Sequence, residues 1–329
     1  MMTSPSPRLK QKKIVIISYE GDAHITFVAQ HLGIPYVTID PISVPNGNSL
    51  SFGSKSGQTI ITYKGEQLKN VIGVWYRKPQ SIDKSKLPVP ENYREYSYSA
   101  LQQFIELLRG QFEDALWVSD YYAIQRARNK VTQLAVAKQV GFRVPDALTT
   151  SDENDARSFV NKYGVVIVKP LASIFPVKNE TKPLGFFATK INPNQSLNGL
   201  AFAPAIFQQL IDAVYDIRVT VVGDKVFSAV ITNEGTTSKE VRDWRLGHVQ
   251  GKIKISAFDD LPRNIAAACI AHQRAFGLNF SAIDLVMDKK GQFWFLENNP
   301  NGQWAFVEEE TGQPIGKAIA QLLMSSDRS

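Results

Sequence analysis

Three oxygen-bearing side chains near the C-terminal end of the chain could together bind a divalent cation. Asp284 lies inside the apolar run 282–287, and Glu297 and Asn299 stand at the end of a second run that begins at residue 292. The polar tetrad between the runs predicts a β-hairpin. Carboxylate and amide oxygens suit Mg²⁺, which usually takes one or two carboxylates plus substrate phosphates. The pattern therefore predicts a magnesium site, although a single strand Asp is more often solvated and E-x-N alone occurs by chance.

The register of this hairpin decides whether the three side chains meet. If Met287 pairs with Gln292, then Asp284 lies opposite Phe295. Because side chains alternate between the faces of a strand, the three candidate ligands then share one face. Diagonal neighbours on such a pair lie about 7–8 Å apart, which leaves room for one or two cations. A slip of one residue would place the ligands on opposite faces.

Cationic side chains occur at the ends of other predicted elements. Lys130 stands near the start of a predicted helix, Lys169 ends an apolar strand, and Arg218 shares a strand face with Asp216. Cations for phosphates, oxygens for Mg²⁺ and an apolar cleft for a base are the requirements of a nucleoside triphosphate site. Taken singly, each lysine is equally typical of a solvated surface. No G-x-x-x-x-G-K-S/T motif occurs, which excludes P-loop chemistry.

The elements that must position these residues follow an α/β pattern. Near the N-terminus, the continuous apolar run 14–17 predicts a buried parallel strand, and strands at 36–39 and 71–77 alternate with helical segments. A helix at 92–115 carries an apolar stripe that predicts a core face. The second half predicts a fold of the α+β type, with helices at 126–141 and 152–163 (capped by Ser151), strands at 165–170 and 205–211, and a long polar loop at 232–250.

Bulk composition is that of an ordinary globular protein, with 43% apolar and 21% charged residues in 329. The net charge of +6 includes four cations in the first thirteen residues, which contain no acid, so the rest of the chain carries only +2. We therefore expect no nucleic-acid partner. The single cysteine excludes an internal disulfide, and no apolar run is long enough for a membrane span or signal peptide. We expect a cytoplasmic protein without membrane association.

The order and spacing of several motifs resemble those of the ATP-grasp ligases, and within them the ribosomal-peptide maturases of the microviridin (graspetide) type. The resemblance spans most of residues 14–324. Its parts are V-W-Y-R at 74–77, N-K at 129–130, V-K-P at 168–170, F-Q-Q-L-I at 207–211, D-I-R-V-T-V-V-G at 216–223, D-W-R at 243–245, A-I-D-L-V at 282–286 and F-L-E-N-N-P-N-G-Q-W at 295–304.

The resemblance implies an ATP-grasp fold with an N-terminal open α/β pre-ATP-grasp domain, and ATP and Mg²⁺ as cofactors. Arg218 would hold the transferred phosphoryl group, and Arg245 would steady the substrate carboxylate, unless it pairs with Asp243 instead. Asp284, Glu297 and Asn299 would bind Mg²⁺. The residues that would contact the nucleotide are the two lysines, the adenine hinge with a ribose partner, and an acid near Arg218: Lys130, Lys169, Gln208, Gln209, Leu210, Ile211, Asp212 and Asp216.

The polar, basic residues 1–13 predict a disordered tail. For the rest of the chain, the resemblance implies a pre-ATP-grasp domain at 14–120, a central lid domain at 121–204 and a C-terminal domain at 205–329. The protein would be a homodimer whose substrate is a precursor peptide with leader and core. Two departures stand out. Gln208-Gln209 replaces the Gln-Glu often found in such hinges, and the segment after Lys169 lacks a glycine-rich phosphate loop. The second departure favours a peptide substrate.

The leading hypothesis is an ATP-dependent ligase that cyclises a ribosomally made peptide through an acyl phosphate, forming side-chain ω-ester or ω-amide bonds. One alternative is a ligase that joins a free amino acid to a peptide or protein carboxylate, as ribosomal-protein glutamate ligases do. A third is a binding module that keeps the nucleotide cleft and recognises a peptide without turnover. The complete Asp, Glu and Asn set argues against the third.

Overall fold

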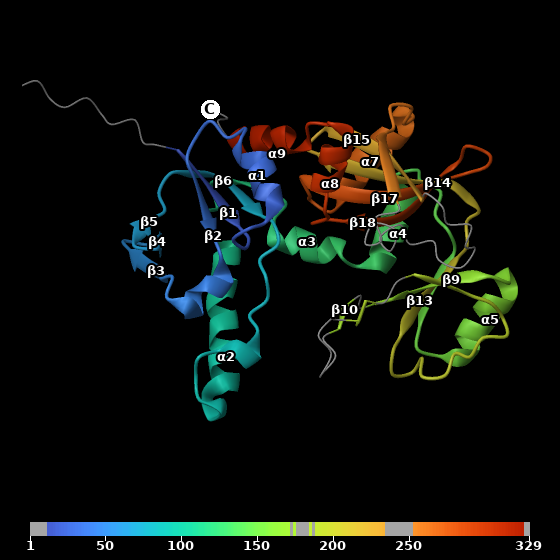
Figure 1. Cartoon of the computed structure of the whole chain (residues 1–329), viewed down its shortest axis with the longest axis horizontal. Coiled ribbons are helices and arrows are strands. Elements are labelled where there is room, and N and C mark those ends of the chain that lie inside the picture. Colours follow the sequence, from blue (N-terminus) through green and yellow to red (C-terminus); the bar gives the residue numbers. More distant parts are fainter. Residues whose placement is uncertain (1–11, 172–173, 176–183, 186–187, 234–252, 326–329) are drawn as a thin grey trace, which may run out of the picture.

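The computed structural model describes residues 12–171, 174–175, 184–185, 188–233 and 253–325 (Figure 1). Arg245 and most of the polar loop predicted at 232–250 lie outside these residues. Among the described helices, none is both long and apolar enough to cross a lipid bilayer.

The N-terminal part contains a parallel sheet in the order β2-β1-β6-β7. Its strands are β1 (Lys13–Ile17), β2 (Tyr36–Ile39), β6 (Val71–Tyr76) and β7 (Leu116–Val118), and α1 (Ala23–Ala29) follows β1. Alternate residues of β1 enter two different apolar clusters, with Ile14 and Ile16 on one face and Val15 and Ile17 on the other. A strand buried on both faces explains the unbroken apolar run in the sequence.

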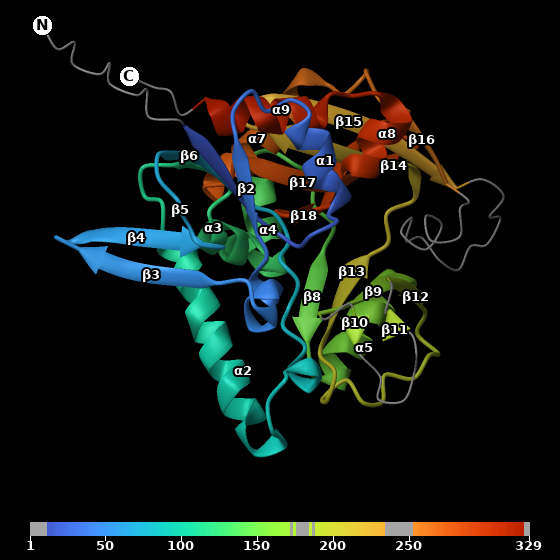
Figure 2. The ribbon, with the colours of Figure 1, turned by 60° about the vertical axis from the view of Figure 1, so that its left-hand side comes forward.

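A second, antiparallel sheet and a long helix extend from this part. The sheet contains β3 (Leu50–Lys55), β4 (Gln58–Tyr63) and β5 (Glu66–Gln67), and the helix is α2 (Glu91–Glu106). Both views show α2 projecting from the body of the molecule (Figures 1 and 2). The helix predicted at 92–115 is thus too long at its C-terminal end, because a 3-10 turn follows at Leu107–Gly110 and Phe112 adopts a positive φ of 62°.

The central part is an antiparallel sheet in the order β12-β9-β13-β8. It consists of β8 (Ala147–Thr150), β9 (Val166–Pro170), β12 (Thr189–Ile191) and β13 (Ala205–Gln209), with α5 (Glu153–Tyr163) on one face, while β10 (Ile174–Phe175) pairs with β11 (Leu184–Gly185) beside it. Asp152, not Ser151, caps α5, accepting the backbone N–H groups of Asn154 and Asp155. Strand β13 ends two residues earlier than predicted. Because β13 pairs with β8 and β9, the central sheet extends past residue 204, the expected end of the central domain.

Two short helices connect the N-terminal and central parts. The helix predicted at 126–141 is instead α3 (Tyr121–Ala127) followed by α4 (Lys130–Gln139). Asn129 interrupts them because its backbone is extended and its side chain accepts the N–H of Thr132, which caps α4. The interruption places Lys130 in the first position of α4.

The C-terminal part is an antiparallel sheet in the order β16-β15-β14-β17-β18. Its strands are β14 (Ala213–Val222), β15 (Lys225–Asn233), β16 (Ile253–Ala257), β17 (Phe280–Asp288) and β18 (Phe293–Asn299). One face packs on α4 and α7 (Arg263–Ala275). Part of the other face packs on α8 (Ala305–Thr311) and α9 (Ile315–Met324), which also contact the N-terminal part.

Backbones meet without intervening side chains where the N-terminal and C-terminal parts join. A Cβ on Gly73 of β6 would lie 2.4 Å from the carbonyl oxygen of Leu323 in α9. A Cβ on Gly316, also in α9, would lie 2.5 Å from the carbonyl oxygen of Phe27 in α1. Both distances are shorter than any van der Waals contact, so only glycine fits at either position. The two parts therefore share one tightly packed core.

Candidate active site

The β17–β18 hairpin brings the three predicted metal ligands to one face, through a register that differs from the predicted one. Met287 pairs with Phe293 rather than Gln292, and Leu285 pairs with Phe295. A β-bulge at Leu296 then shifts the register again, so that Asp284 lies directly opposite Glu297. The predicted Asp284–Phe295 pairing is therefore wrong.

The bulge allows one strand to serve both a core and a site. Phe293 and Phe295 enter the apolar cluster under α7. Strict alternation would place Glu297 on the same face as Phe295, but the extra residue at Leu296 reverses the side of the strand that follows. Glu297 and Asn299 consequently lie on the face that carries Asp284.

Contacts within the trio converge on a single point. The Nδ2 atom of Asn299 donates to Asp284 Oδ2 at 3.2 Å and to Glu297 Oε1 at 3.0 Å. Asp284 and Glu297 are each 8% exposed. Two carboxylate oxygens that both reach one donor can also both reach a cation placed between them, and a turn of the Asn299 amide would present its Oδ1 as a third ligand. The donor set therefore fits a hard divalent cation such as Mg²⁺.

Each carboxylate of the trio also faces a basic side chain. The Lys130 Nζ donates to Glu297 Oε2 at 2.6 Å from the first turn of α4. Arg218 pairs with Asp284 across β14 and β17, and its Nε lies 3.3 Å from Asp284 Oδ1. These two cations neutralise the paired acids, and they are the same residues expected to contact the nucleotide phosphates.

Behind the trio, the outer edge of β18 is closed by backbone of residue 143 and by a side chain from α4. The carbonyl of Arg143 accepts the N–H of Phe295 at 2.8 Å. The amide of Gln133 then acts as a strand would toward Asn298, accepting its N–H at 2.8 Å and donating to its carbonyl at 2.7 Å. Asn298 stands between the two candidate ligands on β18, so Gln133 fixes the backbone that carries both.

A buried histidine completes this support. Asn298 Nδ2 lies 3.1 Å from Ser281 Oγ and 3.3 Å from His272 Nδ1, and His272 Nε2 lies 3.2 Å from the carbonyl of Gln133. Burial lowers the pKa of His272 to about 4, so the ring is neutral at pH 7. Neither Gln133 nor His272 was predicted as part of the site, because each acts through a fold contact that no local motif indicates.

The central sheet presents its own candidate residues on the face opposite α5. Val166, Val168, Ala205 and Phe207 pack into the cluster with α5. Because side chains alternate, Lys169 and Gln208 lie on the other face, and each is opposite an apolar partner in the antiparallel pairing of β9 with β13. This pattern of one cation and one amide amid apolar residues is suited to a nucleotide base and its phosphates.

The remaining hinge residues follow β13. The backbone N–H of Gln209 donates to the carbonyl of Asp146, and Ile211 accepts the N–H of Ala213 through its carbonyl. Asp212 is exposed and pairs with Lys289 at 2.7 Å. Leu210 lies between Gln209 and Ile211, in the connection from β13 to β14. Asp216 lies on β14 opposite Val286, on the face shared with Arg218.

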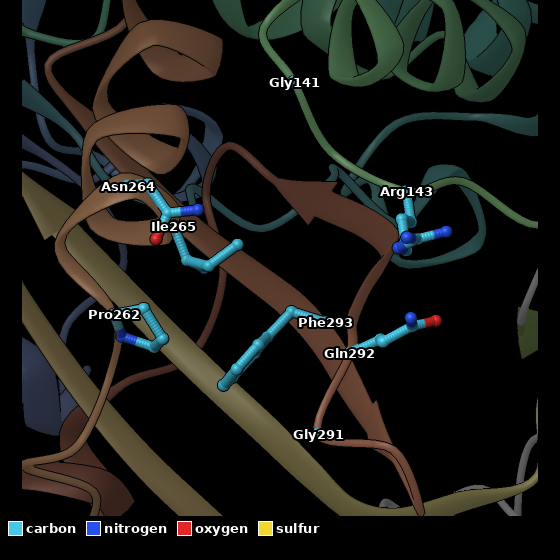
Figure 3. A pocket seen from close by; sticks show the side chains of 8 residues that line it. All are labelled: Gly141, Arg143, Pro262, Asn264, Ile265, Gly291, Gln292 and Phe293. Atoms are coloured by element: carbon cyan, nitrogen blue, oxygen red, sulfur yellow. The ribbon is translucent and has the colours of Figure 1, made fainter.

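A shallow groove of about 270 Å³ lies on the α7 side of the C-terminal sheet (Figure 3). It is lined by the first turn of α7 and by the β17–β18 turn, with Arg143 and Gln292 at one side. None of its lining residues is acidic, and none belongs to the trio. Within the described residues, no group of three or more His, Cys, Asp or Glu side chains gathers elsewhere to bind a metal. The trio is thus the candidate metal site.

Comparisons with solved structures find the same fold over nearly the whole chain. A Chryseobacterium gregarium RiPP-associated ATP-grasp ligase in complex with ADP and a leader and core peptide matches with a TM-score of 0.86 at 23% identity, covering 95% of this chain and 96% of the other. The macrocyclase MdnC from Microcystis aeruginosa, bound with precursor peptide MdnA, matches with a TM-score of 0.80 at 26% identity, covering 94% and 99%.

The ATP-grasp ligase PsnB, complexed with minimal precursor, Mg and ADP, gives a TM-score of 0.77 at 22% identity, covering 98% and 99% of the two chains. No curated protein sequence matches this chain. The family model for the RimK-like ATP-grasp domain matches residues 127–323, which is more than half of the chain and includes every candidate site residue. The chain therefore belongs to the RimK-like ATP-grasp family.

Proposed function

We propose that this protein is an ATP-dependent carboxylate ligase that closes rings in a ribosomally made precursor peptide, forming side-chain ω-esters or ω-amides. The observation that carries the proposal is the convergence of Asp284, Glu297 and Asn299 on one point, with Lys130 and Arg218 each paired to one of the acids. Peptide complexes among the structural relatives, including a macrocyclase at 26% identity, support a peptide as the substrate.

The proposed reaction has two balanced steps. A side-chain carboxylate of the peptide attacks the γ-phosphorus of ATP, which forms an acyl phosphate and releases ADP. A hydroxyl or amine of the same peptide then attacks the acyl carbon, which expels inorganic phosphate and releases the proton of the nucleophile. Each ring closure removes one water from the peptide overall. Bound Mg²⁺ would supply charge neutralisation at the phosphates.

The chain's own residues position and neutralise the reacting groups. Asp284 and Glu297 would exchange their paired cations for the metal, which makes Lys130 and Arg218 available to the phosphates. Arg218 would hold the transferred phosphoryl group, and its position deep in the sheet, 4% exposed, keeps water away from that contact. Lys169 and the backbone of the hinge Gln208, Gln209, Leu210 and Ile211 would hold the nucleotide, with Asp212 at the ribose and Asp216 beside Arg218. Arg245, outside the described residues, remains the proposed substrate-carboxylate contact.

The first test follows product mass. Wild-type protein is incubated with MgATP and a panel of peptides rich in Asp or Glu and in Ser, Thr or Lys, and products are analysed by mass spectrometry. We expect ADP release and a loss of one water per bond formed. A mass gain equal to an added amino acid would instead favour ligation of a free amino acid, and nucleotide binding without ADP release on any peptide would favour the non-catalytic module.

The second test removes single charges from the site. Arg218→Ala and Glu297→Gln should each lower turnover by about 10²–10³, the scale for loss of one preorganised charge contact. Arg274→Ala is the matched control, because Arg274 is exposed and pairs with Asp224 in the β14–β15 turn rather than with any residue of the site. Turnover close to wild type in either site variant, measured as ADP release with a reactive peptide, would contradict the assigned roles.

A further inference from the structure

Arg77 stands where an open α/β sheet usually binds its ligand, but here it binds the chain itself. It follows β6 at the carboxyl edge of the N-terminal parallel sheet, the edge at which such sheets receive ligands. Its Nη1 donates to the Asn301 carbonyl at 3.1 Å, and its Nη2 donates to Gln303 Oε1 at 2.9 Å. Both acceptors lie in residues 300–304, the loop that directly follows Asn299.

Two further residues of the N-terminal part hold the guanidinium in place. Asp22 Oδ2 lies 3.6 Å from Arg77 Nε, and Asp22 Oδ1 lies 2.7 Å from His24 Nδ1. Burial opposes ionisation of Asp22, but the hydrogen bond from His24 and the charge of Arg77 outweigh it and lower the pKa of Asp22 to about 2. Arg77 is 1% exposed and Asp22 is 4% exposed, so the charges are paired inside the protein rather than in solvent.

His24 extends this contact to the end of the loop. Its Nε2 lies 3.1 Å from Arg77 Nη2 and 3.3 Å from the backbone N of Trp304. Both neighbours are donors, so Nε2 accepts and the ring proton resides on Nδ1, toward Asp22. The rings of His24 and Trp304 also meet edge to face, with centroids 5.0 Å apart. The loop is thus held at Asn301, Gln303 and Trp304 by one buried cluster.

The loop has no room to move independently of Asn299. A Cβ on Gly302 would lie 2.6 Å from the Cβ of Ala282 in β17 and 3.2 Å from the Cβ of Asn299. The loop backbone therefore rests directly on the strand that carries Asp284, and Asn301, whose carbonyl accepts from Arg77, follows Asn299 by only two residues. A displacement of the loop would displace the Asn299 amide from the two carboxylates.

We propose that Arg77 is a positioning residue for the metal site: by binding residues 301 and 303 it fixes Asn299 in its place between Asp284 and Glu297. The proposal rests on the proposed function in taking the trio as the metal site. Arg77 touches neither nucleotide nor peptide in this role. The N-terminal part would contribute to cation binding through the loop alone.

Manganese binding tests this role without requiring a reactive peptide. Arg77→Lys keeps the charge beside Asp22 but loses the forked donors, and we expect it to raise the Mn²⁺ dissociation constant of the ADP-loaded protein about tenfold, the low end of the range for outer-shell partners of metal ligands. Free Mn²⁺ is measured by electron paramagnetic resonance. Affinity for ADP without metal should stay within twofold. Arg109→Lys is the control, because Arg109 is a partly buried arginine of the same part that stacks on Tyr121 and does not contact the loop.

A loop-side variant separates positioning from general destabilisation. Gln303→Ala leaves Arg77 in place and removes one of its acceptors, so it should weaken Mn²⁺ binding in the same direction. In the Arg77→Lys, Gln303→Ala double variant, the loss of Mn²⁺ affinity should be smaller than the sum of the two single losses, because both changes break the same contact. Unchanged Mn²⁺ affinity in both single variants, with wild type binding Mn²⁺ and ADP, would overturn the proposal for Arg77 alone. Absence of metal-dependent ADP binding in wild type would instead overturn the proposed function.

Discussion

The Gln133 amide offers a sharp test of how the candidate metal ligands are supported. Gln133 is 1% exposed, and it donates to the carbonyls of Ala127 and Asn298 and accepts the N–H of Asn298. Gln133→Leu preserves approximate volume but leaves both backbone groups of Asn298 without this partner. An unsatisfied buried polar group costs about 1–3 kcal/mol, so we expect the free energy of unfolding to fall by about 3 kcal/mol or more.

With an unfolding entropy of about 2.1 cal/mol/K per residue, a loss of about 3 kcal/mol in a chain of 329 residues corresponds to a fall in Tm of about 4 °C. Thermal unfolding followed by circular dichroism measures this fall, and the Mn²⁺ dissociation constant of the ADP-loaded protein, measured on the same variant below its Tm, should also rise. The control is Gln139→Leu, an exposed position in the same helix, which should change stability by less than about 0.5 kcal/mol. A Tm for Gln133→Leu within about 2 °C of the wild-type value, half the expected fall or less, would refute the proposal that Gln133 supports the edge of β18. A large fall in Tm with unchanged Mn²⁺ affinity would show that the support does not reach the ligands.

Three further predictions follow from burial and charge. Burial holds the pKa of His272 at about 4 against an ordinary 6.5, so the unfolded chain binds the extra proton first. Stability should therefore fall by about 3 kcal/mol as pH decreases from 6.5 to 4, and a pH series of urea titrations should be flatter for His272→Gln. Burial raises the pKa of the Cys269 thiol to about 12, so a thiol reagent should label it only after unfolding, as followed by mass spectrometry. Because Lys130 and Arg218 already neutralise the site acids, Mg²⁺ alone should raise Tm far less than Mg²⁺ with ADP, in a thermal-shift assay; an equal rise would contradict the pairing.

The sequence predicts which residues form the candidate site, but it predicts only part of their arrangement. Asp284, Glu297 and Asn299 were expected on one face and do lie there, but the expected register was off by one residue and the bulge at Leu296 restores the face. On the outer edge of the strand, Phe295, the residue before the bulge, donates its N–H to the carbonyl of Arg143, which is distant in the sequence. No local pattern contains this information.

The same distinction applies to the helices and the supporting residues. Continuous and alternating apolar runs predicted the strands well because burial alone determines them. The predicted helix at 126–141 runs through Asn129, whereas in the structure Asn129 is the N-cap of α4, a position that Asn prefers. The sequence places Arg77 in the V-W-Y-R motif but does not predict its contact with the 300–304 loop, because Asn301 and Gln303 lie more than 220 positions away.

The glycine contacts at Gly73 and Gly316 have a consequence for how a nucleotide enters. Because backbone packs directly on backbone at these two glycines, the N-terminal and C-terminal sheets should move together as one rigid unit. The central sheet has an apolar cluster of its own, drawn from residues 148–207, and both views show it as a distinct lobe below the C-terminal sheet (Figures 1 and 2). If the central sheet moves away from the C-terminal sheet, the motion should therefore occur at the two connecting segments, one before β8 and one after β13. Lys169 and Gln208 would then move with the central sheet, while the candidate metal ligands Asp284, Glu297 and Asn299 stay with the C-terminal sheet.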